Sequence, residues 1–290
     1  MSRPSRLLFA LALGCSGAAP EETGSEPGET GDTGEVVEER EGPPYSAGTC
    51  PELVNGRNES FATGDETRAL RLTLPANPEG APVVFVWHWL GGTADQATEF
   101  LGWDEMAERE NVIVVAPESH PSAMFEWDFG TPDGSNRDLR LFDDLLSCLW
   151  QQFDVDLDRI YATGMSAGGL WTSELTVNRS EWLAATAPLS GGANQDIPDT
   201  TPIPVLLTWG GPTDTYQGYS FDNANYRLSD YLRENGHFVA HCIHSLGHRV
   251  PPGSTEWVWR FLDDHPRGID PEPYLTGLPD DFPDYCSIPE

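Results

Sequence analysis

The chain has 290 residues with 16 Arg, no Lys and 47 Asp or Glu, which gives a formal net charge of −31 at pH 7. Binding to nucleic acid requires a basic face that displaces counterions from phosphates, and binding to anionic lipid headgroups requires a polybasic patch. The negative charge excludes nucleic acid and anionic lipid surfaces as partners. The composition, with 38% hydrophobic and 10% aromatic residues, is typical of a folded protein.

The first residues have the features of an export signal. Two arginines precede the apolar run 7–13, which is too short to cross a bilayer of about 30 Å as a helix. The four residues that end at Cys15 (ALGC) resemble a bacterial lipobox, in which the cysteine is lipidated, although that pattern usually has Leu in place of Ala12. We predict a signal peptide over 1–15, export to the cell envelope or the medium, and a lipid anchor at Cys15 as the only membrane contact. Ordinary secretion is the alternative.

Residues 16–44 are rich in Glu, Gly, Thr, Pro and Ser, and nine acids between 21 and 42 face the single Arg40. Two valines are the only large apolar residues there, too little apolar surface to offset the entropy of ordering. The composition predicts a disordered acidic linker. The folded domain, 45–290, is acidic in its own right, with 13 Arg against 38 acids and a net charge of −25.

Four cysteines remain in the predicted domain: Cys50, Cys148, Cys242 and Cys286. An even number in an exported protein favours two disulfides. The three possible pairings stay open, and only the position of Cys50 and Cys286 near the two domain ends slightly favours that pair. No Cys-x-x-Cys motif is present, so we expect no metal site and no other cofactor.

Strands and helices are predicted in alternation along the domain. Residues 58–63 and 67–74 alternate like exposed strands, whereas 82–87 and 111–116 are continuous apolar runs, typical of strands buried on both faces. Further strands are expected at 159–163, 184–189, 204–208 and 238–244, and helices at 95–110, 138–152, 167–178, 222–234 and 255–263. This pattern predicts an α/β fold with a mostly parallel sheet, which binds ligands at the carboxyl ends of its strands.

A nucleophile motif lies at the end of one of these strands. Residues 164–168 (GMSAG) match G-x-S-x-G between a predicted strand and a predicted helix, which is the context that the motif requires. The two flanking glycines have no Cβ that could collide in so tight a turn. The motif predicts Ser166 as the nucleophile and the backbone N–H of Ala167 as an oxyanion donor.

A serine nucleophile needs a base and an acid that orients the base, and in this fold both come later in the chain. Asp214 lies in a Gly-rich loop just past a strand, whereas its rivals Asp222 and Asp230 fall on a predicted helix. His248 follows the last long strand between a glycine and two prolines, while its rival His244 lies within that strand. We predict Asp214 as the acid and His248 as the base.

The loop after the first buried strand, His88-Trp89-Leu90, is expected to provide the second oxyanion donor. We predict that the backbone N–H of Leu90 is this donor, and that His88 supports the loop rather than acting as a base.

These features together resemble an α/β-hydrolase, and more closely the polyhydroxybutyrate depolymerase and feruloyl esterase group. That group has Val-Asp-x-x-Arg-[Val/Ile]-Tyr-x-x-Gly-x-Ser-x-Gly-Gly, which residues 155–169 match throughout. Residues 209–214 (WGGPTD) and 247–251 (GHRVP) stand where it has His-Gly-x-x-Asp and Gly-His-x-x-Pro. The resemblance covers about 83–266.

The chain departs from the group's pattern at two tryptophans. Trp89 replaces a glycine after the loop histidine, and Trp209 replaces a histidine before the acid loop. Residues 126–129 (EWDF) are similar to the group's aromatic substrate loop. We therefore predict that Trp89, Trp127 and Trp209 contact a flat aromatic or apolar acyl group, with core packing as the alternative.

The resemblance implies a serine esterase that cleaves polyhydroxyalkanoate-type polyesters, or feruloyl or acetyl esters of polysaccharides. We also predict that the chain is a monomer. A peptidase or amidase that uses the same triad, and a binding module that has lost its activity, are the alternatives. Because the domain is acidic, neutral or cationic esters should be better substrates than anionic ones.

Overall fold

The computed structural model describes residues 40–123, 125–129, 135–193 and 200–290. The predicted signal peptide with Cys15 and most of the predicted linker lie outside the described residues. Arg40 donates a hydrogen bond to Leu157 O (2.7 Å) and lies over the Trp182 ring (4.8 Å to its centroid). Arg40 therefore packs on the compact unit, which comprises Arg40–Glu290.

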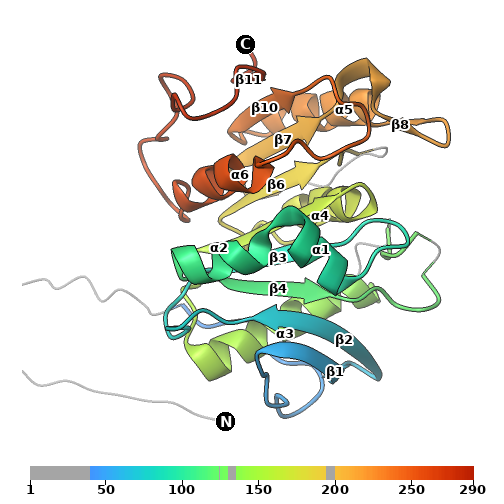
Figure 1. Cartoon of the computed structure of the whole chain (residues 1–290). Coiled ribbons are helices and arrows are strands. Elements are labelled where there is room, and N and C mark those ends of the chain that lie inside the picture. Colours follow the sequence, from blue (N-terminus) through green and yellow to red (C-terminus); the bar gives the residue numbers. More distant parts are fainter. Residues whose placement is uncertain (1–39, 124, 130–134, 194–199) are drawn as a thin grey trace, which may run out of the picture. The chain divides into compact units, whose positions relative to one another are not determined.

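A nine-stranded sheet forms the centre of the part of the chain that the structure describes (Figure 1). Its strands in spatial order are β1 (Gly56–Thr63), β2 (Glu66–Thr73), β4 (Ile113–Pro117), β3 (Val83–Trp87), β5 (Ile160–Met165), β6 (Ala185–Leu189), β7 (Val205–Trp209), β10 (Val239–Ile243) and β11 (Cys286–Ser287). The strands from β4 to β10 run parallel, and β1, β2 and β11 are antiparallel to their neighbours. The mostly parallel sheet is confirmed.

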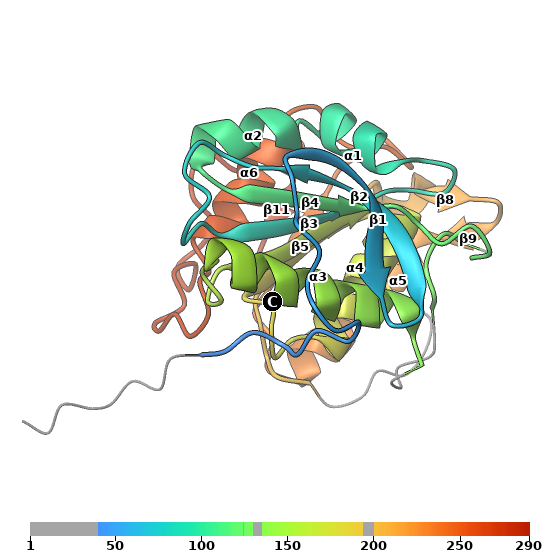
Figure 2. The same cartoon turned by 90° about the horizontal axis from the view of Figure 1, so that it is seen from below.

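Helices cover both faces of this sheet, as Figure 2 shows. On one face lie α1 (Ala94–Leu101), α2 (Trp103–Glu110) and α6 (Ser254–Asp263), and on the other α3 (Arg137–Phe153), α4 (Ala167–Asn178) and α5 (Phe221–Glu234). The single helix expected over 95–110 is wrong, because Gly102 has a φ of 77° and separates α1 from α2. Among the described residues, no helix combines the length and the apolar character needed to cross a membrane.

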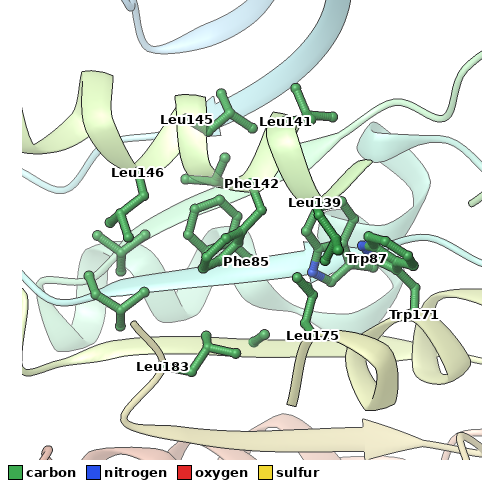
Figure 3. Packing of buried hydrophobic residues seen from close by; sticks show 14 of the residues in the cluster. Phe85, Trp87, Leu139, Leu141, Phe142, Leu145, Leu146, Trp171, Leu175 and Leu183 are labelled. Carbon is green, nitrogen blue, oxygen red and sulfur yellow. The ribbon is translucent and has the colours of Figure 1, made fainter. Parts of the chain in front are cut away.

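The β3 strand shows why two cores form. Side chains alternate along a strand, so Phe85 and Trp87 join the core under α3 and α4 while Val84 and Val86 join the core under α1 and α2. Phe85 packs on Phe142 of α3, with ring centroids 4.6 Å apart (Figure 3). Full burial of such a side chain contributes about 1.5–3 kcal/mol. The sheet is therefore packed on both of its faces.

The domain contains two disulfides, as the even number of cysteines predicts. Cys50 bonds to Cys148, and Cys242 bonds to Cys286. The Cys50–Cys286 pair that chain position slightly favours is wrong, because Cys286 lies opposite Cys242 in the antiparallel β10–β11 pair. The second bond thus attaches the end of the chain to the last strand of the parallel sheet.

Candidate active site

Ser166 lies on the turn between β5 and α4, with φ 60° and ψ −116°. A residue other than glycine is strained in this backbone region, and such strain is concentrated at functional sites. The turn also packs tightly on the end of β3: a Cβ on Gly168 would lie 1.9 Å from Trp87 O, and one on Gly164 would lie 2.6 Å from the same oxygen. Both glycines are therefore required to present the serine.

The structure brings Ser166, His248 and Asp214 together. His248 Nε2 lies 2.9 Å from Ser166 Oγ, and His248 Nδ1 lies 2.7 Å from Asp214 Oδ1. The serine follows β5, the aspartate follows β7, and the histidine lies in the loop after β10. Because these parallel strands end at one edge of the sheet, three distant segments converge there. This arrangement suits transfer of the serine proton to a neutral imidazole whose other nitrogen donates to a carboxylate.

The Asp214 carboxylate is buried and has two further donors. Its Oδ2 accepts hydrogen bonds from Ser190 Oγ (2.7 Å) and from the Gly210 N–H (2.8 Å). A Cβ on Gly210 would lie 2.1 Å from Gly247 O, so the acid and base loops pack directly on each other. Ser190 was not among the site residues predicted from the sequence. Its position directly after β6, a neighbouring parallel strand, could have indicated that it lies at the same edge of the sheet as the site.

Two aromatic rings pack against the His248 ring. Phe221, the first residue of α5, stacks on it with centroids 4.4 Å apart and an interplanar angle of 20°. Tyr216 lies 5.8 Å away in a hairpin of β8 (Thr215–Tyr216) and β9 (Tyr219–Ser220), which the sequence did not predict. These contacts restrict the imidazole to the plane that joins Ser166 and Asp214.

The loop after β3 provides one predicted oxyanion donor and α4 the other. The imidazole of His88 is buried, its Nδ1 lies 2.9 Å from Trp89 O, and its Nε2 accepts the Ser119 N–H at 3.1 Å. His88 thus supports the loop. The described residues provide no hydrogen-bond acceptor for the Leu90 N–H. The Ala167 N–H lies at the amino end of α4, where N–H groups have no acceptor within the helix.

An open cleft of about 540 Å³ lies over Ser166. It is lined by Trp89, Leu90, Phe100, Met165, Ser166, Tyr216, His248, Arg249 and Val250. The Trp89 and Phe100 rings pack edge to face, with centroids 5.6 Å apart, although the Phe100 residue is 70% exposed. The lining is largely apolar, and Arg249 is its cationic residue. Phe100 was missed because it lies on the exposed side of α1.

Two of the three tryptophans predicted to bind substrate do not line this cleft, which corrects the prediction. Trp127 is 2% exposed and donates from Nε1 to His88 O at 3.1 Å. Trp209 is fully buried and donates from Nε1 to Asp222 Oδ1 at 2.7 Å. Both side chains are packed in the core, which was the alternative to substrate binding. Trp89 does line the cleft.

The rival residues have other partners. Asp222 accepts from Trp209, and the buried His244 accepts the Leu246 N–H at Nδ1 (3.2 Å). A further histidine, His241 of β10, lies 2.7 Å from Ser229 Oγ through its Nε2. None of the three bonds to Ser166 or His248 among the described residues.

Because His241 is buried, we expect the folded state to lose stability in acid. Burial, with a smaller contribution from the Arg233 charge, lowers its pKa to about 4. An exposed histidine has a pKa of about 6.5, so the unfolded state binds more protons between these values, and stability falls as pH drops below about 6.5. The free energy of unfolding of the wild type should therefore fall between pH 8 and pH 5. We expect His241→Gln to make this fall smaller by about 2 kcal/mol.

Urea unfolding of the wild type and of His241→Gln at pH 8 and at pH 5 tests this expectation. Carboxylate titration is common to both proteins and cancels in the comparison. Identical pH dependence in the two proteins would mean that His241 is not buried in its neutral form.

The comparisons with known sequences find esterases. No protein-family model matches the chain. It is 28% identical over 235 residues to the putative esterase NocK of Nocardia uniformis subsp. tsuyamanensis, a match over 76% of this chain and 67% of that protein. Poly(3-hydroxyalkanoate) depolymerase C of Paucimonas lemoignei is 24% identical, over 72% of this chain and 50% of that protein. The bifunctional acetylxylan esterase/xylanase XynS20E of Neocallimastix patriciarum is 25% identical, over 68% of this chain.

The chain spans 67%, 50% and 28% of the lengths of these three relatives.

Among solved structures, native pOPH superposes with a TM-score of 0.69 at 19% identity, over 83% of this chain and 98% of that chain. A thermostable esterase superposes with a TM-score of 0.53 at 20% identity, over 69% of this chain and 60% of that chain.

Sheet order, helix placement and these superpositions show the α/β-hydrolase fold. The sequence relatives named above are two esterases and a poly(3-hydroxyalkanoate) depolymerase. A further sequence relative is feruloyl esterase D of Neurospora crassa, which is 23% identical over 51% of this chain.

Proposed function

We propose that the chain is an exported serine esterase in which Ser166, His248 and Asp214 form the catalytic triad. The observation that carries this proposal is the continuous hydrogen-bonded path from Ser166 Oγ through the imidazole to the buried carboxylate, at 2.9 and 2.7 Å. It lies at the base of an open cleft. The export signal read from residues 1–15 supports action outside the cytoplasm, and we propose that the enzyme acts as a monomer, tethered through Cys15.

The first half of the reaction forms an acyl-enzyme. As Ser166 Oγ bonds to the carbonyl carbon, its proton moves to His248 Nε2, and Asp214 stabilises the imidazolium. The carbonyl oxygen becomes an oxyanion that accepts from the N–H groups of Leu90 and Ala167, at about 3 kcal/mol for each donor in comparable sites. The C–O bond then breaks, and the imidazolium gives its proton to the departing alcohol.

The second half repeats these steps with water. His248 accepts a proton from the water as its oxygen attacks the acyl carbon, and the proton then returns to Ser166 Oγ as the acid leaves. The same two N–H groups hold the second oxyanion. No step requires a metal or an organic cofactor.

We propose a polyhydroxyalkanoate-type polyester, or a feruloyl or acetyl ester of a polysaccharide, as the substrate. The names of the relatives support these classes, and the aromatic side chains of Trp89, Phe100 and Tyr216 beside the serine suit an apolar or aromatic acyl group. A peptidase or amidase remains the alternative on the same triad. A module without activity is disfavoured by the hydrogen-bonded path.

Hydrolysis of matched substrates tests the proposal. We expect aryl, acetyl and 3-hydroxybutyryl esters to be cleaved with kcat/KM at least about 100-fold above that for the corresponding anilides, because an alkoxide leaves more readily than an amide nitrogen. Ser166→Ala is the blank for each substrate. Faster cleavage of anilides than of esters would overturn the esterase proposal in favour of an amidase.

A further inference from the structure

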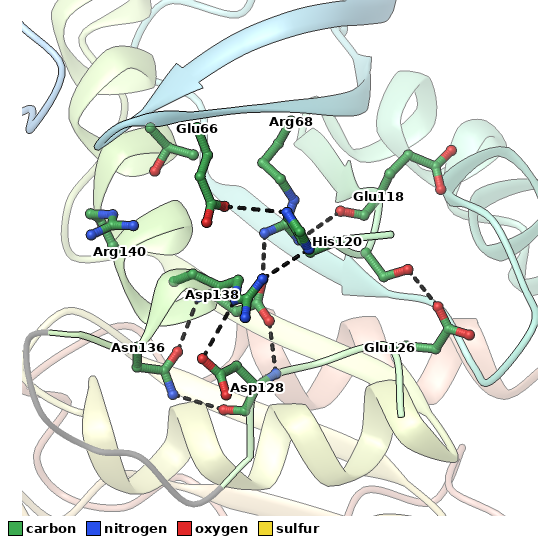
Figure 4. A network of polar contacts seen from close by, with 12 residues as sticks. Glu66, Arg68, Glu118, His120, Glu126, Asp128, Asn136, Asp138 and Arg140 are labelled. Carbon is green, nitrogen blue, oxygen red and sulfur yellow. Dashed lines mark hydrogen bonds and ion pairs between the residues drawn. The ribbon is translucent and has the colours of Figure 1, made fainter. Parts of the chain in front are cut away.

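A buried ion pair anchors the chain on both sides of Glu126. Arg68 Nη1 lies 2.7 Å from Asp138 Oδ1, and both side chains are almost fully buried (Figure 4). Arg68 Nη2 donates to Glu118 O at 2.9 Å, and Asp138 Oδ2 accepts the Asp128 N–H at 2.8 Å. Two backbone positions that flank Glu126 are therefore held by one pair of charges.

Glu126 itself has a strained backbone and a side chain with two partners. Its φ is 71°, a backbone region that is strained for a residue with a Cβ. Its Oε1 accepts the Gly91 N–H at 2.9 Å, and its Oε2 accepts the Ser119 hydroxyl at 2.5 Å. The strained backbone thus directs a carboxylate at the loop that contains Leu90.

The contacts of this loop determine how the Leu90 N–H is oriented. The Leu90 N–H shares a peptide plane with Trp89 O, which lies 2.9 Å from His88 Nδ1 and accepts the Gly92 N–H at 2.9 Å. The next peptide plane contains the Gly91 N–H, which Glu126 accepts. Because both planes that flank the Leu90 Cα are held, the Leu90 N–H has one direction, and it remains available to a ligand.

We infer that Glu126 is a positioning residue, which holds the Leu90 N–H in place for the oxyanion by accepting the Gly91 N–H. The inference rests on the proposed function, because it assigns a role in the same reaction. Glu126 touches neither Ser166 nor His248. Its function is that of a hydrogen-bond acceptor, so its negative charge is not required.

The test compares Glu126→Ala, Glu126→Gln and the control Glu99→Ala, which removes an exposed carboxylate on α1. We expect Glu126→Ala to lower kcat for an ester by about 10- to 100-fold with KM within about 2-fold, because the donor serves the transition state. Glutamine keeps an oxygen acceptor for Gly91, so kcat should stay within about 3-fold of the wild type, as it should in Glu99→Ala.

Two further measurements separate positioning from folding. Glu126→Gly removes the carboxylate but accepts a φ of 71°, so its melting temperature should not fall while its kcat falls as in Glu126→Ala. Inhibition by a phenylboronic acid, whose serine adduct carries an oxygen in the oxyanion position, should weaken in Glu126→Ala by about the same factor as kcat.

Wild-type kcat in Glu126→Ala or Glu126→Gly would overturn the inference and leave the esterase proposal intact. Equal loss in Glu126→Gln and Glu126→Ala would also overturn it, since charge and not the acceptor would then be required. A wild-type protein without esterase activity would instead overturn the proposed function, and this inference with it.

Discussion

Replacement of Asp214 by Asn is expected to lower kcat on esters by about 10⁴-fold while the fold is retained. The reason is that the two oxygens of the Asp214 carboxylate accept different numbers of hydrogen bonds. Oδ2 receives two donors, from Ser190 and Gly210, whereas Oδ1 receives one, from His248. The single oxygen of Asn will face the two donors, and its NH₂ group will face His248 Nδ1. The imidazole must then carry its proton on Nε2 and cannot accept the Ser166 proton.

Steady-state rates of Asp214→Asn and of the control Asp222→Asn test this expectation. Asp222 accepts only from Trp209 Nε1 among the side chains described, and Asn keeps an oxygen for that bond. The control should therefore stay within about 3-fold of the wild type. A loss below about 10-fold in Asp214→Asn would show that Asp214 does not orient the base.

Replacement of Gly168 by Ala is expected to remove activity and to destabilise the fold. The new Cβ would lie 1.9 Å from Trp87 O and 2.7 Å from His88 O, which are backbone atoms of the central sheet and of the loop after it. Overpacking in a rigid core costs about 1–3 kcal/mol or more, and any relief must move Ser166 or the loop with Leu90. We expect kcat/KM to fall at least about 100-fold.

Gly80→Ala is the matched control, because it has a positive φ of 68° and no atom within 4 Å of the added Cβ. It should cost about 1 kcal/mol of backbone strain and leave the rates unchanged. Urea unfolding and kcat/KM of both variants provide the comparison. A Gly168→Ala protein with wild-type rates would contradict the tight turn around Ser166.

The parts of the fold and site that the sequence predicts well are those set by local patterns. Buried β-branched runs and helical spacing give the strands and helices to within a few residues. The G-x-S-x-G turn is local, so Ser166 can be found without a structure. Asp214 and His248 could be proposed because the ends of parallel strands converge at one edge of the sheet.

The errors concern properties that packing between distant elements decides. Trp127 and Trp209 are buried because β3, α4 and α5 cover them, and no pattern around either residue encodes that. The break between α1 and α2 is the exception, because it depends on the local backbone angle of Gly102, a φ of 77°. Ser190 and Glu126 act through single hydrogen bonds to segments far along the chain, and the disulfide pairing depends on the β10–β11 register.

The central claim, that Ser166 is a nucleophile activated by His248, is tested most directly by a fluorophosphonate probe and mass spectrometry of the labelled peptide. The account predicts one phosphonylated serine, Ser166, in the folded wild type, no label in Ser166→Ala, and much slower labelling in His248→Ala. A folded wild-type protein that stays unlabelled, or that carries the label on another serine, would contradict it.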